Sequence, residues 1–324
     1  MLCLGIESTA HTVGVGIASG LEGTKILANV SSSYSPPSGG IHPREAAEHH
    51  VKAIHELIES SLDIAGVDFT DLDLISFAKG PGLGPCLRVG ATAARALSLA
   101  LKRPIVGVNH CIAHLEIGKM ITGCRDPVML YVSGGNTQVI SYQWGRYRIM
   151  GETLDIGIGN LLDKFGRRFS IPFPAGPKIE ELAKGGERML DLPYSVKGMD
   201  VSFSGIFTSL SSMQGELKDL CFSLQETAFA MLVEVTERAM AHLEKDEVLL
   251  GGGVASNLRL REMCSVMARD RGGELHVPKR QYCVDNGAMI ALLGLLLEDQ
   301  SSLDLDNTKI DQNYRTDDVE VTWL

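Results

Sequence analysis

The sequence predicts an α/β protein built from two similar lobes, and three observations support this fold class. Leu2–Ala18 and Val128–Tyr142 each consist of an apolar run, a short polar turn and a second apolar run, the pattern of a β-hairpin. Alternating strand and helix patterns follow each hairpin. Glycine accounts for 35 of the 324 residues, which favours tight turns over a helical bundle. We therefore expect one lobe over 1–125, a second over 126–300, and an acidic C-terminal extension over 301–324.

The remaining elements follow in order along the chain. Tyr34–Gly40 (YSPPSGG) is expected to be a loop because of its Pro, Ser and Gly content. The turn Gly80–Pro85 (GPGLGP) is a strong helix-entry signal, and Glu247–Leu250 reads as a strand that ends in Gly251–Gly253, with a helix near Asn257–Arg269 beyond it. Helices are predicted over 43–64, 87–102, 109–121, 153–170, 177–185, 219–244 and 286–298.

Composition and charge indicate a globular protein of a reducing compartment. Hydrophobic residues make up 44% and charged residues 22%, which excludes wholesale disorder. The seven cysteines form no Cys-x-x-Cys pair, which argues against a zinc ribbon. The N-terminus lacks a basic segment before an apolar one, and the longest apolar run, Ala288–Leu297, is too short to span a bilayer. We expect a cytoplasmic protein that needs no membrane.

The net charge of −10 is concentrated at the C-terminal end. Glu298–Leu324 contains eight acidic and two basic residues, a sum of −6, so residues 1–297 carry only −4. The last residues alternate weakly, like a short edge strand, and a solvated terminus is the simplest interpretation of the segment. A nucleic-acid partner remains compatible with this balance, because local patches decide such binding.

Two histidines have the spacing of metal ligands. His110 and His114 lie four residues apart on the predicted helix 109–121, so both rings share one face. Two histidines on a helix surface are the alternative interpretation. Cys111 stands where an HExxH zinc protease carries its general base, which disfavours a peptidase.

Glycine-rich turns indicate a nucleotide site. The turns SGGN (133–136) and GGG (251–253), with the polar tip of the first hairpin, let backbone N–H groups approach phosphate oxygens. One such turn is more often a plain tight turn. Three in this arrangement are similar to the two-lobed actin-like ATPase fold (sugar kinases, heat-shock ATPases, actin), with the active site between the lobes. The first loop begins GIEST, where those kinases carry Asp-x-Gly, and this disfavours ordinary γ-phosphoryl transfer.

Stretches across nearly the whole chain carry a more specific resemblance. They are GIESTAHTVGVGI (5–17), GGIHPREAAEHH (39–50), KGPGLGPCLRVG (79–90), VGVNHCIAH (106–114), YVSGGNTQV (131–139), GNLLDKFGR (159–167), VKGMDVSFSG (196–205), GGGVASN (251–257) and DNGAMIA (285–291). The chain resembles the tRNA threonylcarbamoyladenosine-synthesis family, formerly called O-sialoglycoprotein endopeptidase. Tyr131 and the form SGGN, in place of SGGH, are similar to its archaeal and eukaryotic branch, the catalytic subunit of the KEOPS complex.

The resemblance implies one metal ion, held by His110, His114, Tyr131 and Asp285. Two imidazoles, a phenolate and a carboxylate suit iron first, with zinc or manganese as alternatives. Without the resemblance, Tyr131 would be interpreted as a core aromatic residue and Asp285 as a helix N-cap, a purpose it could serve as well.

The resemblance also implies a bound nucleotide, either ATP or AMP or the substrate threonylcarbamoyl-AMP. Asp163 and Glu180 would accept hydrogen bonds from ribose hydroxyls, and a solvated helix face is their alternative interpretation. Glu7, His11 and His42 are expected near the reacting end of the cleft, with Glu7 and His42 as catalytic residues. The full implied binding set is Tyr131, Val132, Ser133, Gly134, Gly135, Asn136, Asp163, Gly176, Glu180 and Asn257.

The implied reaction transfers a threonylcarbamoyl group from threonylcarbamoyl-AMP to the exocyclic amine of the adenosine 3′ of the tRNA anticodon, and AMP leaves. The metal would act as a Lewis acid, while Glu7 or a bound water takes the amine proton. The implied partners are tRNA, a small protein kinase or ATPase on a separate chain, and the other KEOPS subunits.

Two basic groups are predicted to contact tRNA, with partner subunits supplying part of the affinity. A solvated helix face is the alternative for each group. The predicted contacts are Arg88, Arg95 and Lys102 on one helix, and Lys164, Arg167 and Arg168 on another.

Three other functions stay open from the sequence. They are an actin-like ATPase or small-molecule kinase without transferase activity, a metallopeptidase, and a non-catalytic scaffold that retains nucleotide binding.

Overall fold

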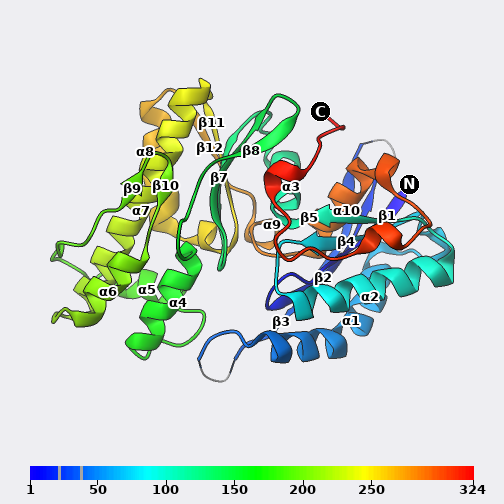
Figure 1. Ribbon diagram of the computed structural model, residues 1–324, viewed down its shortest axis with the longest axis horizontal. Helices are drawn as coiled ribbons and strands as arrows, with labels where there is room; N and C mark the ends of the chain where they lie inside the picture. The colour runs from blue at the N-terminus through cyan, green and yellow to red at the C-terminus, as the bar shows by residue number, and fades with distance from the viewer. Residues whose placement is uncertain (21–22, 37–38) are drawn as a thin grey trace.

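The computed structural model describes residues 1–20, 23–36 and 39–324, and it arranges them as two lobes that lie side by side (Figure 1). Each lobe contains one five-stranded sheet, and helices cover both. The predicted α/β class is therefore confirmed. The predicted boundary at 125/126 stays a prediction, although the strands of the first sheet all precede it and those of the second all follow it.

The two sheets have the same topology. In each, an antiparallel meander of three strands is extended by two parallel strands. The first sheet has the order β3-β2-β1-β4-β5 and the second the order β12-β11-β6-β7-β8. The strands of the first sheet are β1 (Leu2–Glu7), β2 (Thr12–Ser19), β3 (Lys25–Ser33), β4 (Leu74–Gly80) and β5 (Ile105–Asn109). Those of the second are β6 (Val128–Val132), β7 (Thr137–Gln143), β8 (Arg146–Glu152), β11 (Glu247–Gly251) and β12 (Glu274–His276).

Both predicted hairpins are confirmed, and each begins its lobe. Glu7 pairs with Gly14 at the tip of β1–β2, and Val132 pairs with Thr137 at the tip of β6–β7. The second tip is a four-residue turn that the Ser133 N–H closes by donating to the Asn136 carbonyl at 2.9 Å. The equivalent first strands of the two sheets thus present polar loops at their carboxyl ends.

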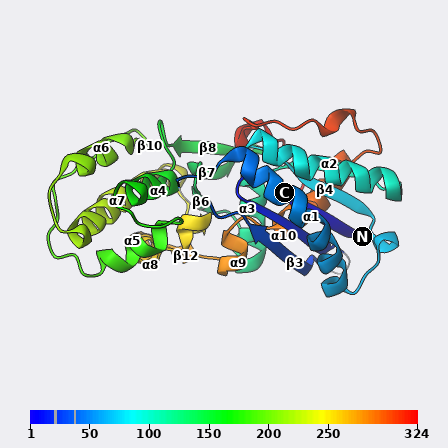
Figure 2. The same ribbon diagram turned by 90° about the horizontal axis from the view of Figure 1, so that it is seen from below.

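Helices of the first lobe lie on both faces of its sheet. Helices α1 (Pro43–Ala65) and α2 (Gly84–Leu101) pack on one face, where they share a buried apolar cluster with β1, β2 and β4. Helices α3 (His110–Thr122) and α10 (Gly287–Leu296) form the other layer. The cluster that contains them also includes residues of β6, β7 and β11, so these two helices lie between the sheets, near the middle of the molecule (Figure 2).

Helix α10 lies directly on the backbone of the first hairpin. A Cβ added at Gly5 or Gly16 would collide with the α10 backbone at Ala291 or Ala288. Glycine is therefore required in β1 and β2 for the helix to approach this closely. Although α10 falls within the predicted range 126–300, it packs against the first sheet and against α3. This packing brings Asp285, which precedes α10, beside the histidines of α3.

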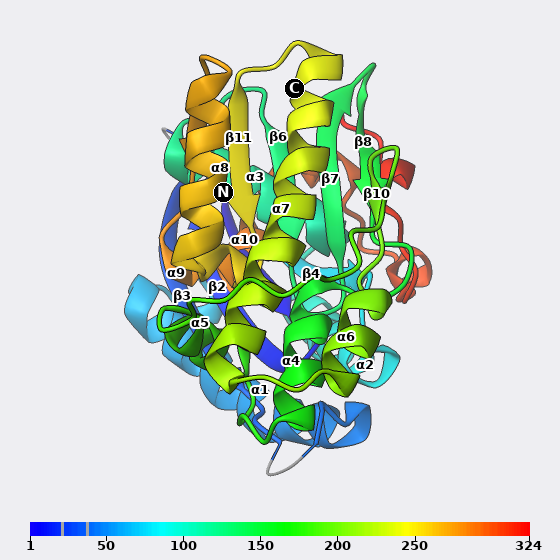
Figure 3. The same cartoon turned by 90° about the vertical axis from the view of Figure 1, so that its left-hand side faces the viewer.

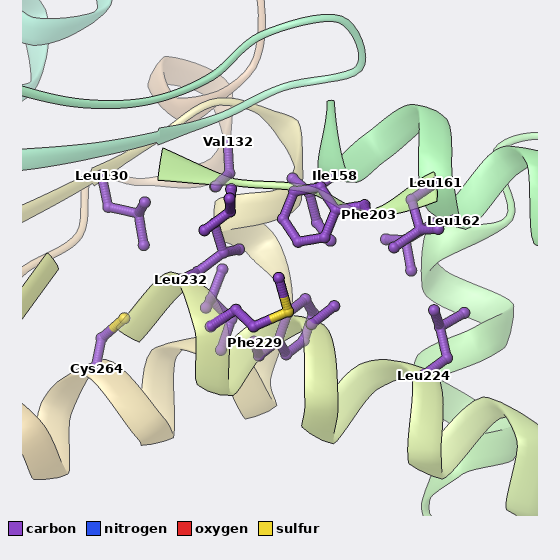
Figure 4. Close-up of a cluster of buried hydrophobic side chains, with 14 of the residues drawn as sticks. Leu130, Val132, Ile158, Leu161, Leu162, Phe203, Leu224, Phe229, Leu232 and Cys264 are labelled. Carbon is purple, nitrogen blue, oxygen red and sulfur yellow. The ribbon is translucent and has the colours of Figure 1, made fainter. Parts of the chain in front are cut away.

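The second lobe buries its largest apolar cluster under helices on the outer face of its sheet. Figure 3 shows α7 and α8 lying over strands β11, β6 and β7. In Figure 4, Leu130 and Val132 of β6 face Phe229 and Leu232 of α7, and all four are buried. The helices of this lobe are α4 (Ile158–Arg168), α5 (Gly176–Ala183), α6 (Ser204–Ser212), α7 (Leu217–Leu243) and α8 (Leu258–Asp270).

Short elements complete the fold. They are β9 (Val196–Lys197), β10 (Asp200–Val201), α9 (Arg280–Cys283) and the 3-10 turns η1 (Phe69–Asp71), η2 (Gly253–Ser256), η3 (Glu298–Gln300), η4 (Asp306–Thr308) and η5 (Thr316–Asp318).

The predicted helices are present, with small shifts at their ends. The largest shift concerns 153–170, whose helix begins only at Ile158, because the Asp155 carboxylate accepts hydrogen bonds from the Phe203 and Ser204 N–H groups and holds the preceding turn. The predicted loop Tyr34–Gly40 falls partly outside the described residues, and its described part is neither helix nor strand. None of the helices in the described part of the chain combines the length and apolarity needed to cross a membrane.

The acidic C-terminal segment packs along both lobes, so its interpretation as a solvated terminus was wrong. Ser302 forms an antiparallel bridge with Ile105 of β5, and Glu320 forms one with Arg146 at the edge of β8. Trp323 donates its indole N–H to the buried Glu116 carboxylate of α3 at 3.0 Å. In Figure 1 this segment, drawn in red, runs from the first lobe across to the second.

Candidate metal centre

Two histidines and one aspartate converge in the layer between the sheets. The Nε2 atoms of His110 and His114 lie 3.5 and 3.2 Å from Asp285 Oδ1. The Tyr131 hydroxyl lies 3.0 Å from His110 Nε2. His110 and His114 come from the first turns of α3, Tyr131 from β6, and Asp285 from the turn between α9 and α10. The structure therefore brings all four predicted metal ligands together, although they are distant in sequence.

Asparagine caps place these side chains. Asn109 ends β5, and its Oδ1 accepts hydrogen bonds from the N–H groups of Cys111 and Ile112, which starts α3 at His110. Asn286 caps α10 in the same way through Met289 N–H at 3.0 Å. The interpretation of Asp285 as an N-cap is thus corrected, because its neighbour Asn286 has that role. Asp285 is left free to face the histidines.

The four donor groups fit a transition metal. One ligand atom from each of His110, His114 and Asp285 lies within 4.8 Å of the others. Three of these donor pairs, His110–Tyr131, His114–Asp285 and His110–Asp285, are 3.0–3.5 Å apart. Neighbouring ligands around an ion with bonds of about 2.1 Å are about 3.0–3.4 Å apart, so these three separations are close to those of a bound ion. The side chains of His110, His114 and Tyr131 are buried, so bulk water has little access to them.

Burial and charge act in opposite directions on the acid–base groups of the centre. Burial lowers the pKa of His110, but the Glu7 carboxylate more than reverses this and raises the pKa to about 9. For Asp285, burial raises the pKa, while the His114 hydrogen bond and the His110 charge hold it well below its usual range. Burial raises the pKa of Tyr131 well above its usual value and lowers that of His114. The pKa directions of Asp285 and His114 favour the ionised carboxylate and the neutral imidazole that metal ligation requires. Those of His110 and Tyr131 favour the protonated forms, so metal binding at these two groups would release protons.

Glu7 lies behind His110, on the side away from the other ligands. Its Oε2 accepts the His110 Nδ1–H at 2.8 Å, and its Oε1 accepts the N–H and hydroxyl of Thr9 at 2.6 and 2.5 Å. The side chain is fully buried. A carboxylate that binds the second nitrogen of a ligating imidazole fixes its tautomer and orientation. These contacts are those of a positioning residue, and the predicted role of Glu7 as a catalytic base stays a prediction.

His42, the other residue predicted to be catalytic, has no such partner among the described residues. His42 is exposed at the start of α1, and its side chain makes no capping hydrogen bond. His11, at the tip of the first hairpin, packs edge-on against Phe173 of the second lobe with ring centroids 5.8 Å apart. The structure therefore places His11 at a contact between the lobes, while the role of His42 stays a prediction.

The tip of the second hairpin is an open glycine turn. Gly134 and Gly135 are exposed, and a Cβ added at either would meet nothing within 4 Å. The carbonyls of Ser133 and Gly134 accept the N–H groups of Gly159 and Asn160 at 3.1 and 2.9 Å, which seats the tip on the first turn of α4. Val132 is buried in the core, so only its backbone can face a ligand.

The predicted nucleoside residues gather around α5. Asp163 Oδ1 accepts the Ala175 N–H at 2.9 Å, next to Gly176 at the start of that helix. Glu180 Oε1 accepts the Leu258 N–H at 2.8 Å, beside Asn257, which caps α8. Burial raises the pKa of Asp163. Both carboxylates are half-buried and accept a backbone hydrogen bond, and their role at ribose hydroxyls stays a prediction.

The predicted tRNA contacts differ in their surroundings. Arg95 donates to the Thr308 hydroxyl at 2.8 Å and to its carbonyl, so it anchors the C-terminal segment. Arg88 and Lys102 on the same helix side are exposed. Lys164 is half-buried, and Arg167 and Arg168 are exposed at the end of α4. Contact of these residues with tRNA stays a prediction.

Several site residues escaped the sequence analysis. Asn109, immediately before the histidine pair, has the signature of an N-cap and could have been found from it. Thr9 and Gln225 carry no local signal: Thr9 holds Glu7, and Gln225 accepts the Asn257 side-chain N–H at 2.9 Å. The C-terminal residues Tyr314 and Arg315 were also missed. Their backbone carbonyls accept hydrogen bonds from Asn109, a contact that no local sequence pattern indicates.

Comparison with known sequences gives a consistent set of relatives. The family model described as tRNA N6-adenosine threonylcarbamoyltransferase matches residues 25–292. A protein with that name from Thermococcus kodakarensis is 56% identical over 328 residues, which cover 100% of both chains. A "probable bifunctional tRNA threonylcarbamoyladenosine biosynthesis protein" from Thermoplasma volcanium is also 56% identical, but this chain spans only 62% of its length.

Solved structures share the fold at low sequence identity. HypF from T. kodakarensis superposes with a TM-score of 0.62 at 16% identity, over 92% of this chain and 48% of HypF. The (R)-2-hydroxyglutaryl-CoA dehydratase component A of Acidaminococcus fermentans gives 0.55 at 13% identity, over 91% and 97%. These likenesses concern the fold alone, and they confirm the expected two-lobed actin-like ATPase architecture.

Proposed function

The chain belongs to the tRNA N6-adenosine threonylcarbamoyltransferase family, and from this premise we propose that it transfers threonylcarbamoyl from threonylcarbamoyl-AMP to the N6 amine of the adenosine 3′ of the tRNA anticodon. The observation that carries the proposal is the convergence of His110, His114, Tyr131 and Asp285 in a chain 56% identical, end to end, to a relative with that name.

One metal ion completes the proposed centre. His110, His114, Tyr131 and Asp285 would hold it, with iron as the first choice and zinc or manganese as alternatives. When bound, the ion supplies Lewis-acid polarisation of a phosphate or carbonyl oxygen of the substrate. The buried Glu7 carboxylate accepts the Nδ1–H of His110, so Nε2 is the nitrogen that would bind the ion once it has released its own proton.

The remaining residues bind and orient the nucleotide in this proposal. The open glycine turn at Gly134 and Gly135 leaves room for phosphate oxygens beside the second hairpin. Asp163 and Glu180 have carboxylate oxygens available to ribose hydroxyls near Gly176. Asn257 already uses its amide to cap α8 and to bind Gln225. In this proposal it lies beside the nucleoside, next to Glu180, and its amide groups stay in these two contacts.

The adenine amine is a weak nucleophile because its lone pair is delocalised into the ring, so positioning must supply much of the rate. A base must accept the proton that the amine releases. Both Glu7 oxygens already accept hydrogen bonds from Thr9 and His110, so we assign this proton to a water molecule.

We propose tRNA, a small protein kinase or ATPase and the other KEOPS subunits as partners, and the cytoplasm as the location. The net charge of −10 supports a need for basic surface from partners, because tRNA affinity depends on contacts with phosphates.

The proposal is tested by transfer of labelled threonine into unmodified tRNA, in a mixture with a threonylcarbamoyl-AMP synthase, ATP, bicarbonate and the KEOPS partners. Wild-type protein should incorporate label, and His110→Ala should lose at least about 100-fold of the rate, since a ligand is removed. His55→Ala is the matched control, because His55 is 77% exposed on α1. Absence of incorporation in a mixture that a related enzyme drives would favour the ATPase or scaffold function.

A further inference from the structure

A short part of the acidic C-terminal segment, residues 311–316, touches three elements that carry the metal centre. It enters the first lobe where the Asp311 N–H donates to the Lys79 carbonyl at 2.8 Å. It leaves toward the second lobe where Arg315 lies 3.7 Å from Glu152 of β8. No role follows for this segment from the transfer reaction itself.

The first contact is with the helix that carries both histidines. Asn109 Nδ2 donates to the carbonyls of Tyr314 and Arg315, each at 3.2 Å, while its Oδ1 caps α3. Asn109 is 1% exposed. The side chain of Asn109 therefore binds its own helix through Oδ1 and the C-terminal segment through Nδ2.

The second contact reaches Glu7 through the loop before α2. Gln312 accepts the Gly82 N–H with its backbone carbonyl and the Gly84 N–H with Oε1, both at 3.2 Å. Leu83 of the same loop donates its N–H to the Thr9 carbonyl at 2.7 Å. Thr9 in turn holds the Glu7 carboxylate that orients His110.

The third contact lies opposite the tyrosine. Tyr131 of β6 pairs with Gln138 of β7, and the Gln138 Oε1 accepts the Thr316 hydroxyl at 3.5 Å. Gln138 also donates to Glu152, the carboxylate beside Arg315. The segment is thus tied to the strand pair that delivers the fourth ligand from the second lobe.

We propose that residues 311–316 are a positioning segment for the metal centre, which fixes the N-cap of α3 through Asn109 and the Glu7–His110 contact through Gln312. The proposal rests on the metal-dependent function proposed above. It assigns the acidic C-terminal segment to the metal-binding machinery, because this stretch of six residues contacts the supports of His110, Glu7 and Tyr131 at once.

The test measures Co²⁺ binding to the full-length apo protein by visible absorption, without any turnover. Asn109→Ser keeps an oxygen that caps α3 but removes the amide donor to the segment. Gln312→Ala removes the Gly84 contact, and Gln312→Glu retains an acceptor at the N-terminus of α2, where a negative charge is favoured. Asn313→Ala is the control, because Asn313 is exposed like Gln312 but directs no side-chain hydrogen bond to the described residues of α2 or α3.

We expect Asn109→Ser and Gln312→Ala to weaken Co²⁺ binding by about 10- to 100-fold and to alter the absorption bands, as loss of supports around metal ligands does. Gln312→Glu and Asn313→Ala should bind within about twofold of wild type. A segment that only stabilises the fold would lower the melting temperature of the apo protein and leave Co²⁺ affinity unchanged, which would overturn the proposal.

The experiment also separates this proposal from the function on which it rests. If wild-type protein gives no Co²⁺ spectrum that depends on His110, the metal function fails and the positioning proposal falls with it. If wild type gives that spectrum and both Asn109→Ser and Gln312→Ala retain wild-type affinity, only the positioning segment is wrong.

Discussion

At the scale of single residues, Glu7 illustrates how a tertiary contact changes the meaning of a motif residue. The family resemblance implied that Glu7 of the GIEST loop, or a bound water, takes the amine proton of the substrate. In the structure Glu7 is fully buried and uses both oxygens, one on His110 and one on Thr9. Its carboxylate thus holds the ring of His110, one of the four predicted metal ligands.

Glu7→Gln separates the two roles. The amide has the same size but lacks the charge that holds the His110 Nδ1 proton, so we expect metal affinity to fall by about tenfold together with transfer activity. Metal affinity from a Co²⁺ titration and the rate of threonine transfer are the two measurements. Loss of activity at unchanged metal affinity would instead identify Glu7 as the base, and an unchanged rate would exclude it.

His50 is a second residue whose burial has a measurable consequence. It is fully buried on α1, and its Nε2–H donates to the Ala10 carbonyl at 3.0 Å, which holds the first hairpin tip. Burial lowers the pKa of His50 to about 4, below the usual value of about 6.5. The neutral form therefore stabilises the folded protein above pH 6.5, and this contribution is lost as the pH falls toward 4.

The free energy of unfolding should accordingly fall by a few kcal/mol between pH 6.5 and 4 through this residue alone. Urea unfolding of the metal-free protein at several pH values measures it. His50→Gln keeps a donor for Ala10 but cannot titrate, so the difference between wild type and variant isolates the His50 contribution. Parallel pH profiles for the two proteins would contradict the assignment.

At the scale of elements, the position of α10 determines where Asp285 lies. The helix contacts the backbone of β1 and β2 at Gly5 and Gly16, and Asn286 starts it one residue after the aspartate. The glycines in the strands and the asparagine cap on the helix thus together determine the position of α10 and of Asp285. Side chains in place of either glycine would lift the helix and its aspartate away from His110 and His114.

Gly16→Ala should therefore destabilise the protein by more than the 1–3 kcal/mol or so usual for an added methylene, because backbone meets the new Cβ. Urea unfolding gives the loss, and a Co²⁺ titration of the folded fraction should show weakened binding. Gly253→Ala is the control, since a Cβ there meets nothing within 4 Å. Equal stability of the two variants would show that α10 can shift at little cost.

At the scale of the whole molecule, the proposed ion would join the two lobes. His110, His114 and Asp285 lie on elements packed against the first sheet, while Tyr131 belongs to the second. The C-terminal segment also bridges both, from Ser302 to Glu320. The C-terminal segment and the proposed metal ion would therefore both connect the two lobes.

Metal binding should raise the melting temperature of the protein. An ion that binds only the folded state stabilises it by about 2.7 kcal/mol at 100 times its dissociation constant, a shift on the order of 5 °C for a chain of this size. Calorimetry with Co²⁺ or Zn²⁺, and again after chelation, measures the shift. His114→Ala should abolish it, and an identical shift in that variant would place the ion elsewhere.

The local elements of the fold could be read from the sequence. Hairpins, helices and the pairing of His110 with His114 on one helix face depend on periodicity and spacing within a few residues. The repeated hairpin also indicated two similar lobes, which the matching sheet topologies bear out. Family resemblance, rather than any local pattern, supplied Tyr131 and Asp285.

Only the tertiary structure decided which distant residues support the site. Glu7 and His110 are 103 positions apart, His114 and Asp285 171, and Asn109 and Tyr314 205. Helix α10 packs against the first sheet, and the acidic segment runs over both lobes. Burial of apolar area stabilises such contacts whatever the separation of the residues along the chain. Local sequence determines which elements form, whereas the packing of those elements determines which polar groups meet between them.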